Sequence, residues 1–165
     1  MDFKERYTTI FLADKTKPAR FFLLKRAATK RFAPNLYTGF GGKVEEGETR
    51  KQGAYRELEE ETGLTNIKLT EFGRLIINQQ KILYQFFGVY VGEPLSCNEG
   101  LVETVETDKL FFLPLIPTAK LFLEAWEQRN WRTTEHFTLL IERKNPEDVF
   151  SPILSVEAQP GLMGK

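Results

Sequence analysis

The glutamates Glu57, Glu60 and Glu61 are spaced so that a helix would carry all three on one face. If residues 49–62 form that helix, each residue turns by roughly 100°, so the three carboxylates share about a 100° arc and Glu59 points nearly the opposite way. Carboxylates three and four residues apart repel one another. A hard divalent cation offsets this repulsion, because Mg²⁺ takes carboxylate and phosphate oxygens as ligands. The spacing therefore indicates a metal site for a phosphorylated compound, with a solvated charged helix as the alternative.

The ends of this helix are marked by residue type. Thr49 stands near its start, and Gly63 is expected to stop it. An apolar face adjoins the acidic face and can pack on a core. It carries Ala54, Tyr55 and Leu58. One side of the helix would thus anchor it, while the other side stays free for chemistry.

The segment before the helix, Gly39-Phe40-Gly41-Gly42, has three glycines in four residues. Glycine allows a positive φ and a close approach of the backbone, so such a loop can set backbone groups beside a metal or a phosphate. A short apolar run, residues 36–38, comes just before it. These features predict one unit in which a strand leads through a glycine loop into the acidic helix.

Two neighbours of the glutamates allow two interpretations each. Arg56 can pair with Glu60 one helical turn further on, or it can turn toward another glutamate of the site and fix its orientation. Glu48 can accept hydrogen bonds at the helix start, where negative groups are favoured, or support the metal ligands from outside. We expect both residues to support the site rather than to bind the substrate.

The composition predicts one globular domain over residues 1–165, because hydrophobic residues make up 41% of the chain and aromatic residues 13%. This length suffices for a sizeable core. The 23 basic and 23 acidic residues give a net charge of zero. A general nucleic-acid or membrane-surface binder would carry a basic excess. We therefore expect neither of these partners, whereas a small nucleotide ligand is compatible with the charge balance.

The cysteine content and the N-terminus predict a cytoplasmic protein. Cys97 is the only cysteine, so no intrachain disulfide can form and a reducing compartment is natural. The first six residues are rich in charge and lead into no apolar stretch of signal length, and no apolar run approaches the length of a membrane span.

The remaining elements give an α+β fold. Six runs rich in aromatic or branched residues predict strands: residues 8–13, 20–25, 68–78, 81–91, 109–113 and 136–142. A second helix is expected over residues 118–129, after Pro117, and residues 78–80 look like a hairpin turn. From residue 143 the tail has prolines and no clear period, so it either wraps the domain or is partly mobile.

Residues 42–64 resemble the Nudix box, G-x5-E-x7-R-E-U-x-E-E-x-G-U with U aliphatic, at all nine specified positions. The box begins at Gly42, and its REUxEE part begins at Arg56. The resemblance implies a metal-dependent hydrolase that cuts a nucleoside diphosphate linked to another group. It also implies an α/β/α sandwich around a mixed central sheet.

Residues 23–26, 37–49 and 53–58 are similar to the MutT-type branch of that family, which clears oxidised purine nucleoside triphosphates. This resemblance implies that the cofactor is Mg²⁺, with Mn²⁺ as the alternative. It implies metal ligation by Gly42, Glu57, Glu60, Glu61 and Glu106. Glu106 would approach from a distant loop as a ligand or as the general base, with Glu103 and Asp108 as its competitors and a surface glutamate as the alternative.

The same resemblance implies a substrate-binding set that consists of Lys25, Thr38, Phe40, Gly41, Gly42, Lys43 and Phe122. Lys25 and Arg26, at a strand end, would meet the phosphates, with a solvated strand terminus as the alternative. Thr38 stands where the oxidised-purine enzymes have an asparagine that reads the base. Those enzymes also carry a tryptophan and paired aspartates where this chain offers Phe122 and Glu124, so Phe122 would stack on a base unless it belongs to the core.

These observations favour a Mg²⁺-dependent pyrophosphohydrolase of nucleoside triphosphates, such as 8-oxo-dGTP or dGTP, that releases the monophosphate and pyrophosphate. Arg56 would support catalysis by Glu57, Glu60 and Glu106, with Glu106 or Glu57 taking the proton from water. One alternative is another nucleoside diphosphate derivative, such as a nucleotide sugar, a dinucleoside polyphosphate or capped RNA. The other is a catalytically silent domain that senses nucleotides.

Overall fold

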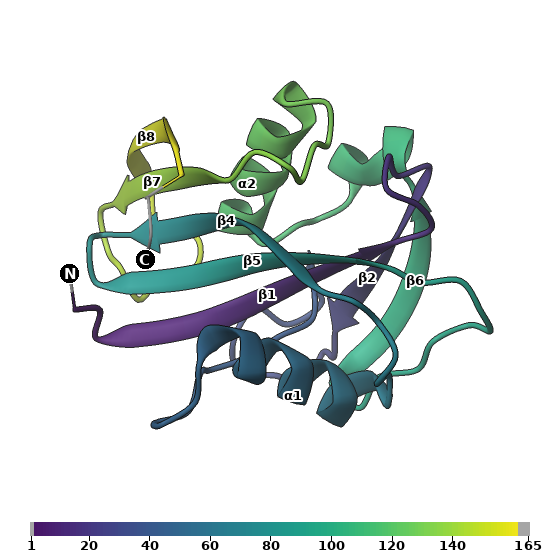
Figure 1. Cartoon of the computed structure of the whole chain (residues 1–165). Helices are drawn as coiled ribbons and strands as arrows, with labels where there is room; N and C mark the ends of the chain where they lie inside the picture. Colours follow the sequence, from purple (N-terminus) through teal and green to yellow (C-terminus); the bar gives the residue numbers. More distant parts are fainter. Residues whose placement is uncertain (1, 162–165) are drawn as a thin grey trace.

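A computed structural model describes residues 2–161 of the chain. At its centre lies one eight-stranded sheet, with helix α1 (Arg50–Thr62) on one face and helix α2 (Pro117–Gln128) on the other (Figure 1). A short 3₁₀ helix, η1, covers Thr107–Phe112. The strands are β1 (Glu5–Ala13), β2 (Arg20–Arg26), β3 (Tyr37–Thr38), β4 (Thr70–Ile77), β5 (Lys81–Val89), β6 (Gly100–Glu106), β7 (Phe137–Arg143) and β8 (Ile153–Pro160).

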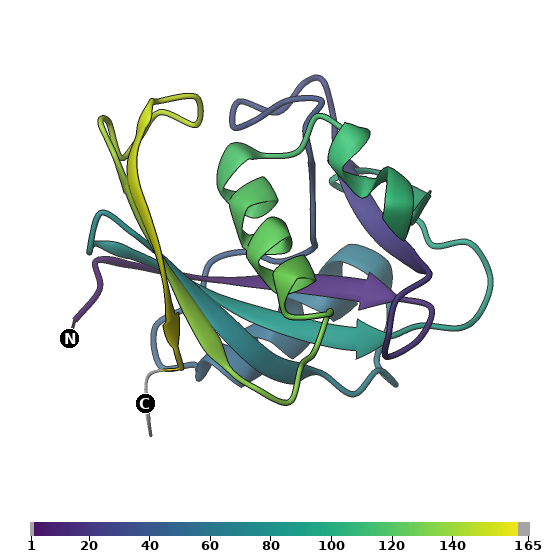
Figure 2. The same ribbon diagram turned by 90° about the horizontal axis from the view of Figure 1, so that it is seen from above.

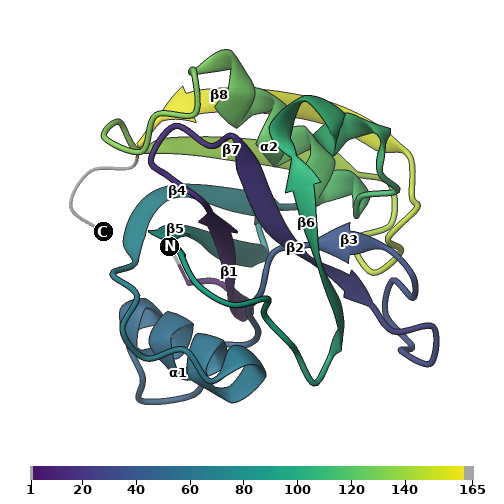
Figure 3. The same cartoon turned by 90° about the vertical axis from the view of Figure 1, so that its right-hand side faces the viewer.

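The sheet is mixed. Its order is β3-β2-β1-β5-β4-β7-β8, and β6 pairs along β2. The β1–β5 and β4–β7 pairs are parallel, and the other pairs between named strands are antiparallel. Figure 3 shows β6, β2 and β3 at one end of the sheet and the β7–β8 pair at the other. The predicted sandwich of a mixed sheet between helices is confirmed.

β1 changes its neighbour along its length, and this change creates room for the site. Near its end, Leu12 pairs with β2. Nearer its start, Tyr7 and Ile10 instead form bridges with Lys43 and Phe40 of the glycine-rich segment. That segment leads into α1, so β1, the glycine loop and the acidic helix meet at one place.

Alternate residues of β1 enter two separate cores, as expected of a strand covered on both faces. Ile10 and Leu12 pack with the α1 side, which includes Ala54 and Leu58. Phe11 and Ala13 pack with the α2 side, a cluster that contains Phe122, Leu123 and Trp126. Each helix is therefore held to the sheet by its own apolar face.

α1 begins at Arg50, one residue after its predicted start, and ends at Thr62 as predicted, and its two caps explain these bounds. The Thr49 side chain accepts from the Gln52 N–H while the Gln52 side chain accepts from the Thr49 N–H, which satisfies two donors of the first turn. At the other end Gly63 has φ 79°, a left-handed conformation that glycine adopts without strain. The second helix begins and ends one residue before its predicted bounds.

One predicted strand is wrong. Residues 109–113 do not form a strand, because most of that range belongs to η1. The true strand in this region is β6, which pairs with β2 over residues 100–106. Val105 is its only fully buried residue, so β6 lacks the alternation of apolar residues that marks a half-buried strand. The aromatic pair Phe111 and Phe112 led to the wrong prediction, because aromatic residues are also common in strands.

Of the two alternatives for the tail, the structure shows wrapping. After β7 the chain turns back, and β8 pairs antiparallel with β7 from Ile153 to Pro160. The predicted hairpin turn at residues 78–80 joins β4 and β5. None of the helices within residues 2–161 has both the length and the apolar character needed to cross a bilayer.

Candidate active site

The glycine loop presses against both β1 and α1. Gly41 has φ 140°, and a Cβ atom on it would lie 2.1 Å from the Thr8 carbonyl oxygen. A Cβ atom on Gly42 would lie 2.6 Å from the carboxyl carbon of Glu57. The backbone of β1 therefore excludes a side chain at Gly41, whereas a side chain at Gly42 would have to displace the Glu57 carboxylate.

Glu61 is the most deeply buried carboxylate of the site, with 7% of its surface exposed. Its Oε1 accepts from the Gly41 N–H at 2.8 Å. Its Oε2 is buried and accepts no hydrogen bond from the residues that the structure describes. Burial raises the pKa of Glu61 to about 7, although the Gly41 N–H works against the rise. This oxygen is a donor atom that lacks a partner.

Glu57 lies beside Gly42 and is partly enclosed as well. Burial raises its pKa, and the hydrogen bond from Arg56 counteracts this effect. That bond joins Arg56 Nη1 to Glu57 Oε1 at 2.9 Å. Glu57 and Glu61 also repel each other, which adds to the raised pKa of Glu61. The two carboxylates thus form a pair whose joint ionisation is disfavoured until positive charge arrives.

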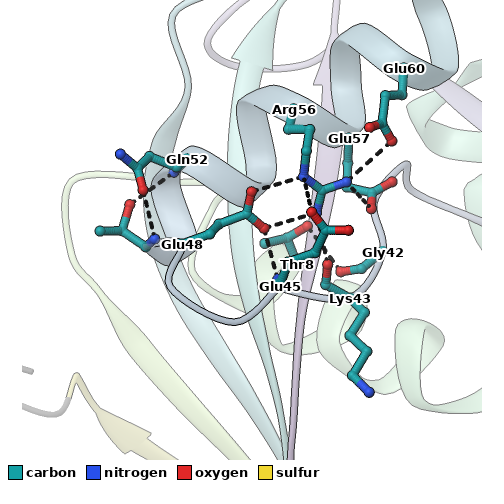
Figure 4. A network of polar contacts seen from close by, with 10 residues as sticks. Thr8, Gly42, Lys43, Glu45, Glu48, Gln52, Arg56, Glu57 and Glu60 are labelled. Atoms are coloured by element: carbon teal, nitrogen blue, oxygen red, sulfur yellow. Dashed lines mark hydrogen bonds and ion pairs between the residues drawn. The ribbon is translucent and has the colours of Figure 1, made fainter.

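Arg56 is the centre of the network that holds these groups (Figure 4). Its Nε and Nη2 donate to the two Glu48 oxygens at 2.8 and 2.9 Å, and Nη2 also donates to the Lys43 carbonyl at 2.9 Å. Nη1 reaches both Glu57 and, at 3.2 Å, Glu60. Both interpretations of Arg56 are therefore correct, because one guanidinium makes the helix pair and orients a site glutamate.

Glu48 anchors Arg56 rather than the substrate region. Its hydrogen bonds with Arg56 lower the pKa of Glu48 to about 2, so it stays ionised at neutral pH. Glu48 Oε1 also accepts from the Glu45 N–H at 2.8 Å, just before the helix. The carboxylate therefore supports the loop, the helix start and the arginine together.

A cavity of about 240 Å³ opens beside the glycine loop and contains Glu61 in its lining. Its walls are largely apolar and come from both the sheet and α2: Leu75, Ile77, Leu83, Ile116 and Ala119. Polar side chains at intervals along it include Thr9, Thr38 and Gln85. An apolar slot with a few polar groups is the usual form of a small-molecule site.

Two loops close this cavity from above the sheet. Figure 2 shows the segment that joins β7 to β8 beside the one that joins β2 to β3, next to the start of α2. Val149 of the first segment packs with Ala33 of the second and with Ile116 before α2. Phe32 and Val149 both line the cavity.

Four of the residues predicted to bind substrate lie on the cavity: Thr38, Phe40, Gly41 and Gly42. Two others do not. The Lys43 side chain extends away from the glutamates (Figure 4). The Nζ of Lys25 lies 5.9 Å from the centre of the Tyr37 ring, and the β2 cation that lines the cavity is Arg26.

The role predicted for Glu106 is wrong. Glu106 pairs in register with Arg20, at the opposite end of β2 from Arg26. Six residues of strand separate Arg20 from Arg26, or about 20 Å. The Glu106 carboxylate instead forms an exposed ion pair with Arg20, with Nε and Oε1 3.2 Å apart.

Glu99 is the acidic residue that the distant chain segment brings to the site, and sequence reasoning missed it. It precedes β6 at the end that pairs with Arg26, lines the cavity, and contributes to the raised pKa of Glu61. Its Oε2 pairs with Lys30 Nζ at 2.9 Å. A strand prediction that began at Gly100, paired with β2, would have pointed to it.

Phe122 is also not a substrate residue. Its side chain has no exposed surface, and its ring stacks on Phe137 with 4.8 Å between centroids and meets Phe72 at 5.7 Å. A base cannot stack on a ring that is enclosed in the core. The neighbours of Phe122 that do line the cavity are Thr118 and Ala119, at the start of α2.

The donor atoms at the cavity mouth suit a divalent cation of the hard type. Within residues 2–161, no three His, Cys, Asp or Glu side chains are gathered tightly enough to form a metal site by themselves. Yet Glu61 keeps one buried oxygen without a partner, and Glu57 lies against the same loop. Two neighbouring carboxylates whose ionisation is disfavoured offer the oxygen ligands that Mg²⁺ or Mn²⁺ prefers.

Comparison with known proteins agrees with this arrangement. The family model described as the NUDIX domain matches residues 4–137. A protein of Danio rerio named oxidized purine nucleoside triphosphate hydrolase is 37% identical over 87 residues, which cover 49% of this chain and 56% of that protein. Its namesake from Mus musculus is 50% identical over 92 residues, covering 52% and 59%. The chain thus spans less than two thirds of the length of these curated relatives.

Among solved structures, the mutator MutT protein from Bacillus halodurans superposes on this chain with a TM-score of 0.70. The match covers 93% of this chain and 97% of that one, at 19% sequence identity. At this identity the likeness concerns the fold. It places the mixed sheet and the helices on its two faces in the same architecture.

Proposed function

The chain belongs to the NUDIX domain family, and on that premise we propose that it is a Mg²⁺-dependent pyrophosphohydrolase. Its substrates are nucleoside triphosphates, 8-oxo-dGTP or dGTP among them, and its products are the monophosphate and pyrophosphate. The observation that carries this proposal is the pair Glu57 and Glu61 under the Gly41–Gly42 loop, at the mouth of a cavity with apolar walls. The names of the two curated relatives support the substrate class.

Glu57, Glu60 and Glu61 would hold the cation, which neutralises charge on the phosphates and makes a bound water more acidic. The close approach of Gly42 to Glu57 keeps that carboxylate against the loop. Arg56 fixes Glu57 and Glu60 at once and is itself fixed by Glu48. The helix therefore presents its carboxylates in a set geometry before the substrate arrives.

Glu57 is the best placed proton acceptor within the described chain. It is partly enclosed against Gly42 and is held by Arg56, as a general base must be positioned for proton transfer. Water attacks a phosphorus of the diphosphate bridge, the bond to the bridging oxygen breaks, and Glu57 takes the proton from the water. Arg26, which lines the cavity beside Glu99, lies where it can contact the phosphates.

The apolar walls of the cavity would hold the base. Thr38, from β3, offers one hydroxyl group that can donate or accept at this surface. This arrangement supports a nucleotide more than a purely anionic polyphosphate, because the apolar walls between the sheet and α2 suit a ring system.

The test is a Mg²⁺-dependent release assay on a panel with 8-oxo-dGTP, dGTP, the other nucleoside triphosphates, ADP-ribose, dinucleoside polyphosphates and capped RNA. Wild type should release pyrophosphate from a triphosphate, and Glu61→Gln should lower the rate of release by at least about 100-fold. Glu59→Gln is the matched control, because Glu59 is an exposed glutamate of the same helix.

The remaining outcomes decide between the alternatives. Turnover of a compound other than a triphosphate would keep the chemistry and replace the substrate. Nucleotide binding without metal-dependent turnover of any compound on the panel would show that the chain is a nucleotide sensor and not an enzyme. An equal fall in the rate of pyrophosphate release in Glu61→Gln and Glu59→Gln would show that Glu61 has no specific role in the reaction.

A further inference from the structure

The side of the cavity beyond β1 from the glycine loop, its far end, is lined by Lys81 and Arg143. Lys81 begins β5 and Arg143 ends β7. From β1 to β7 the cavity crosses β5 and β4, three strand spacings or about 14 Å. One cavity therefore has an acidic mouth and a cationic far end, and the glutamates and the glycine loop do not account for the cations at the far end.

Arg143 is an arginine with an unused donor. Only 4% of its surface is exposed. Its Nη2 donates to the Pro146 carbonyl, whereas its buried Nε has no acceptor within residues 2–161. A buried N–H without an acceptor destabilises the folded protein, so the position favours any ligand that brings an acceptor atom.

The charge at this end is largely compensated already. Lys81 Nζ lies 3.5 Å from Glu5 Oε2 and 4.0 Å from Glu147 Oε2. Glu147 and Asp148 also act on the Arg143 guanidinium, whose charge they stabilise against burial. The far end therefore lacks an acceptor atom rather than a negative charge, which favours a neutral group over a carboxylate or a phosphate.

The walls beside Arg143 indicate what that neutral group belongs to. Ile77 and Leu83 of the sheet and Val149 of the loop after β7 give apolar surfaces on more than one side. A flat ring fits between such walls, and the span from the mouth suits the larger, two-ring bases. Oxopurines such as guanine carry a carbonyl oxygen on the ring edge, whereas adenine carries an amino donor at that position.

We propose that Arg143 determines base specificity by donating a hydrogen bond to the ring carbonyl of an oxopurine. The inference rests on the proposed function in taking the ligand to be a nucleotide, with its phosphates at the glutamate end. Adenine would set an amino donor against the Arg143 donor and leave both unsatisfied. A single hydrogen bond from a charged donor changes affinity by about tenfold or more.

The experiment is a calorimetric titration of the full chain with dIMP, dGMP and dAMP, which needs no turnover. Hypoxanthine shares the ring carbonyl with guanine but lacks its amino group, so dIMP isolates the contact in question. Wild type should bind dIMP and dGMP at least about tenfold more tightly than dAMP. Arg143→Met should remove that preference mainly by weakening dIMP and dGMP.

Arg129→Met is the matched control. Arg129 is another arginine with a buried Nε that lacks an acceptor in the described chain, but it stacks on Phe137 and does not line the cavity. Its variant should keep the preference. If Arg143→Met does not fold, Arg143→Lys keeps the charge without the guanidinium and should still lower the preference.

Equal weakening of all three nucleotides in the Arg143 variants would overturn the proposal, because it would show a structural role alone. Equal affinity of wild type for dIMP and dAMP would overturn it too. A carbonyl preference in a protein that hydrolyses no triphosphate would leave this inference standing while the proposed function fails.

Discussion

At the mouth of the cavity the chemistry comes from neighbouring stretches of chain, whereas at its far end it is assembled by the topology of the sheet. Gly41, Gly42, Glu57 and Glu61 lie within one loop and one helix. Lys81 and Arg143 come from strands that are separated in the sequence and are brought together by the order β1-β5-β4-β7.

The contrast shows how a catalytic unit and a recognition unit can vary independently. The mouth depends on helical spacing and on two glycines, so a change there should affect every substrate alike. The far end depends on which side chains the strands happen to carry, so a change there should alter the ranking of substrates. The following variants would break or sharpen that division.

The largest effect is expected for Glu57→Gln. Removing the proton acceptor should lower kcat for every triphosphate by about 10²- to 10⁴-fold, while KM changes little. Steady-state kinetics with two different bases would check this, with Glu59→Gln as the control on the same helix. A loss confined to one base would contradict the division between the two ends.

A second prediction concerns stability and pH in metal-free buffer. Because burial raises the pKa of Glu61 to about 7 from an ordinary 4.5, the folded state binds more protons than the unfolded state between these values. Ionised Glu61 therefore destabilises the fold, and the penalty grows as the pH rises from 4.5 through 7.

Urea unfolding of wild type and Glu61→Gln in the presence of a chelator would measure that penalty. The free energy of unfolding of the variant should rise relative to that of wild type as the pH rises. The difference between the two should be on the order of 3 kcal/mol above pH 7 and almost none below pH 4.5. A difference that stays constant across this range would mean that Glu61 is not strained in the metal-free protein.

Gly42→Ala should have the next largest effect. The new Cβ would lie 2.6 Å from the Glu57 carboxyl group and displace it, so turnover of all substrates should fall by about tenfold or more. Overpacking at this point should also cost about 1–3 kcal/mol of unfolding free energy. Kinetics and urea unfolding of the same preparation would give both numbers.

Gly47→Ala is the matched control for that loop. Gly47 has φ 84° and open space around its Cβ position, so alanine there is strained but meets no side chain. It should lose stability while keeping most of its turnover. If both alanine variants lose turnover equally, the contact between Gly42 and Glu57 is not what matters.

The smallest effect is expected at the recognition end. Thr38→Val removes the hydroxyl group from the cavity wall while keeping its shape, so it should change the ratio of kcat/KM between bases by a few-fold, in line with about 1 kcal/mol for a neutral hydrogen bond. Competition between dGTP and dATP in one reaction would reveal it. A uniform loss on both would place Thr38 with the catalytic unit instead.

The sequence was sufficient to predict the acidic helix and the glycine loop before it. The spacing of Glu57 and Glu61, and the residues Thr49 and Gly63 at the helix ends, are local signals that a helical period translates directly into space. Arg56 was ambiguous in the sequence because one guanidinium can make several contacts, and in the structure it does.

Residues that depend on strand register or on helix orientation could not be predicted. Glu106 and Glu99 lie at opposite ends of β6, and their positions relative to Arg26 follow from a pairing of β6 with β2 that no short pattern reveals. The residue type of Phe122 did not distinguish a ring in the core from a ring in the cavity, and the structure places it in the core. Arg143 reaches the cavity because β7 lies next to β4, a neighbour that comes much earlier in the chain.

The most direct test of the central claim is a crystal structure grown with Mn²⁺ and dGMP, with anomalous scattering used to locate the metal. Our account predicts a Mn²⁺ peak within coordination distance of Glu57 and Glu61, with the base between the sheet and α2. Mn²⁺ bound elsewhere, for example at the exposed Glu106, or a base outside the cavity with Glu61 unliganded, would contradict it.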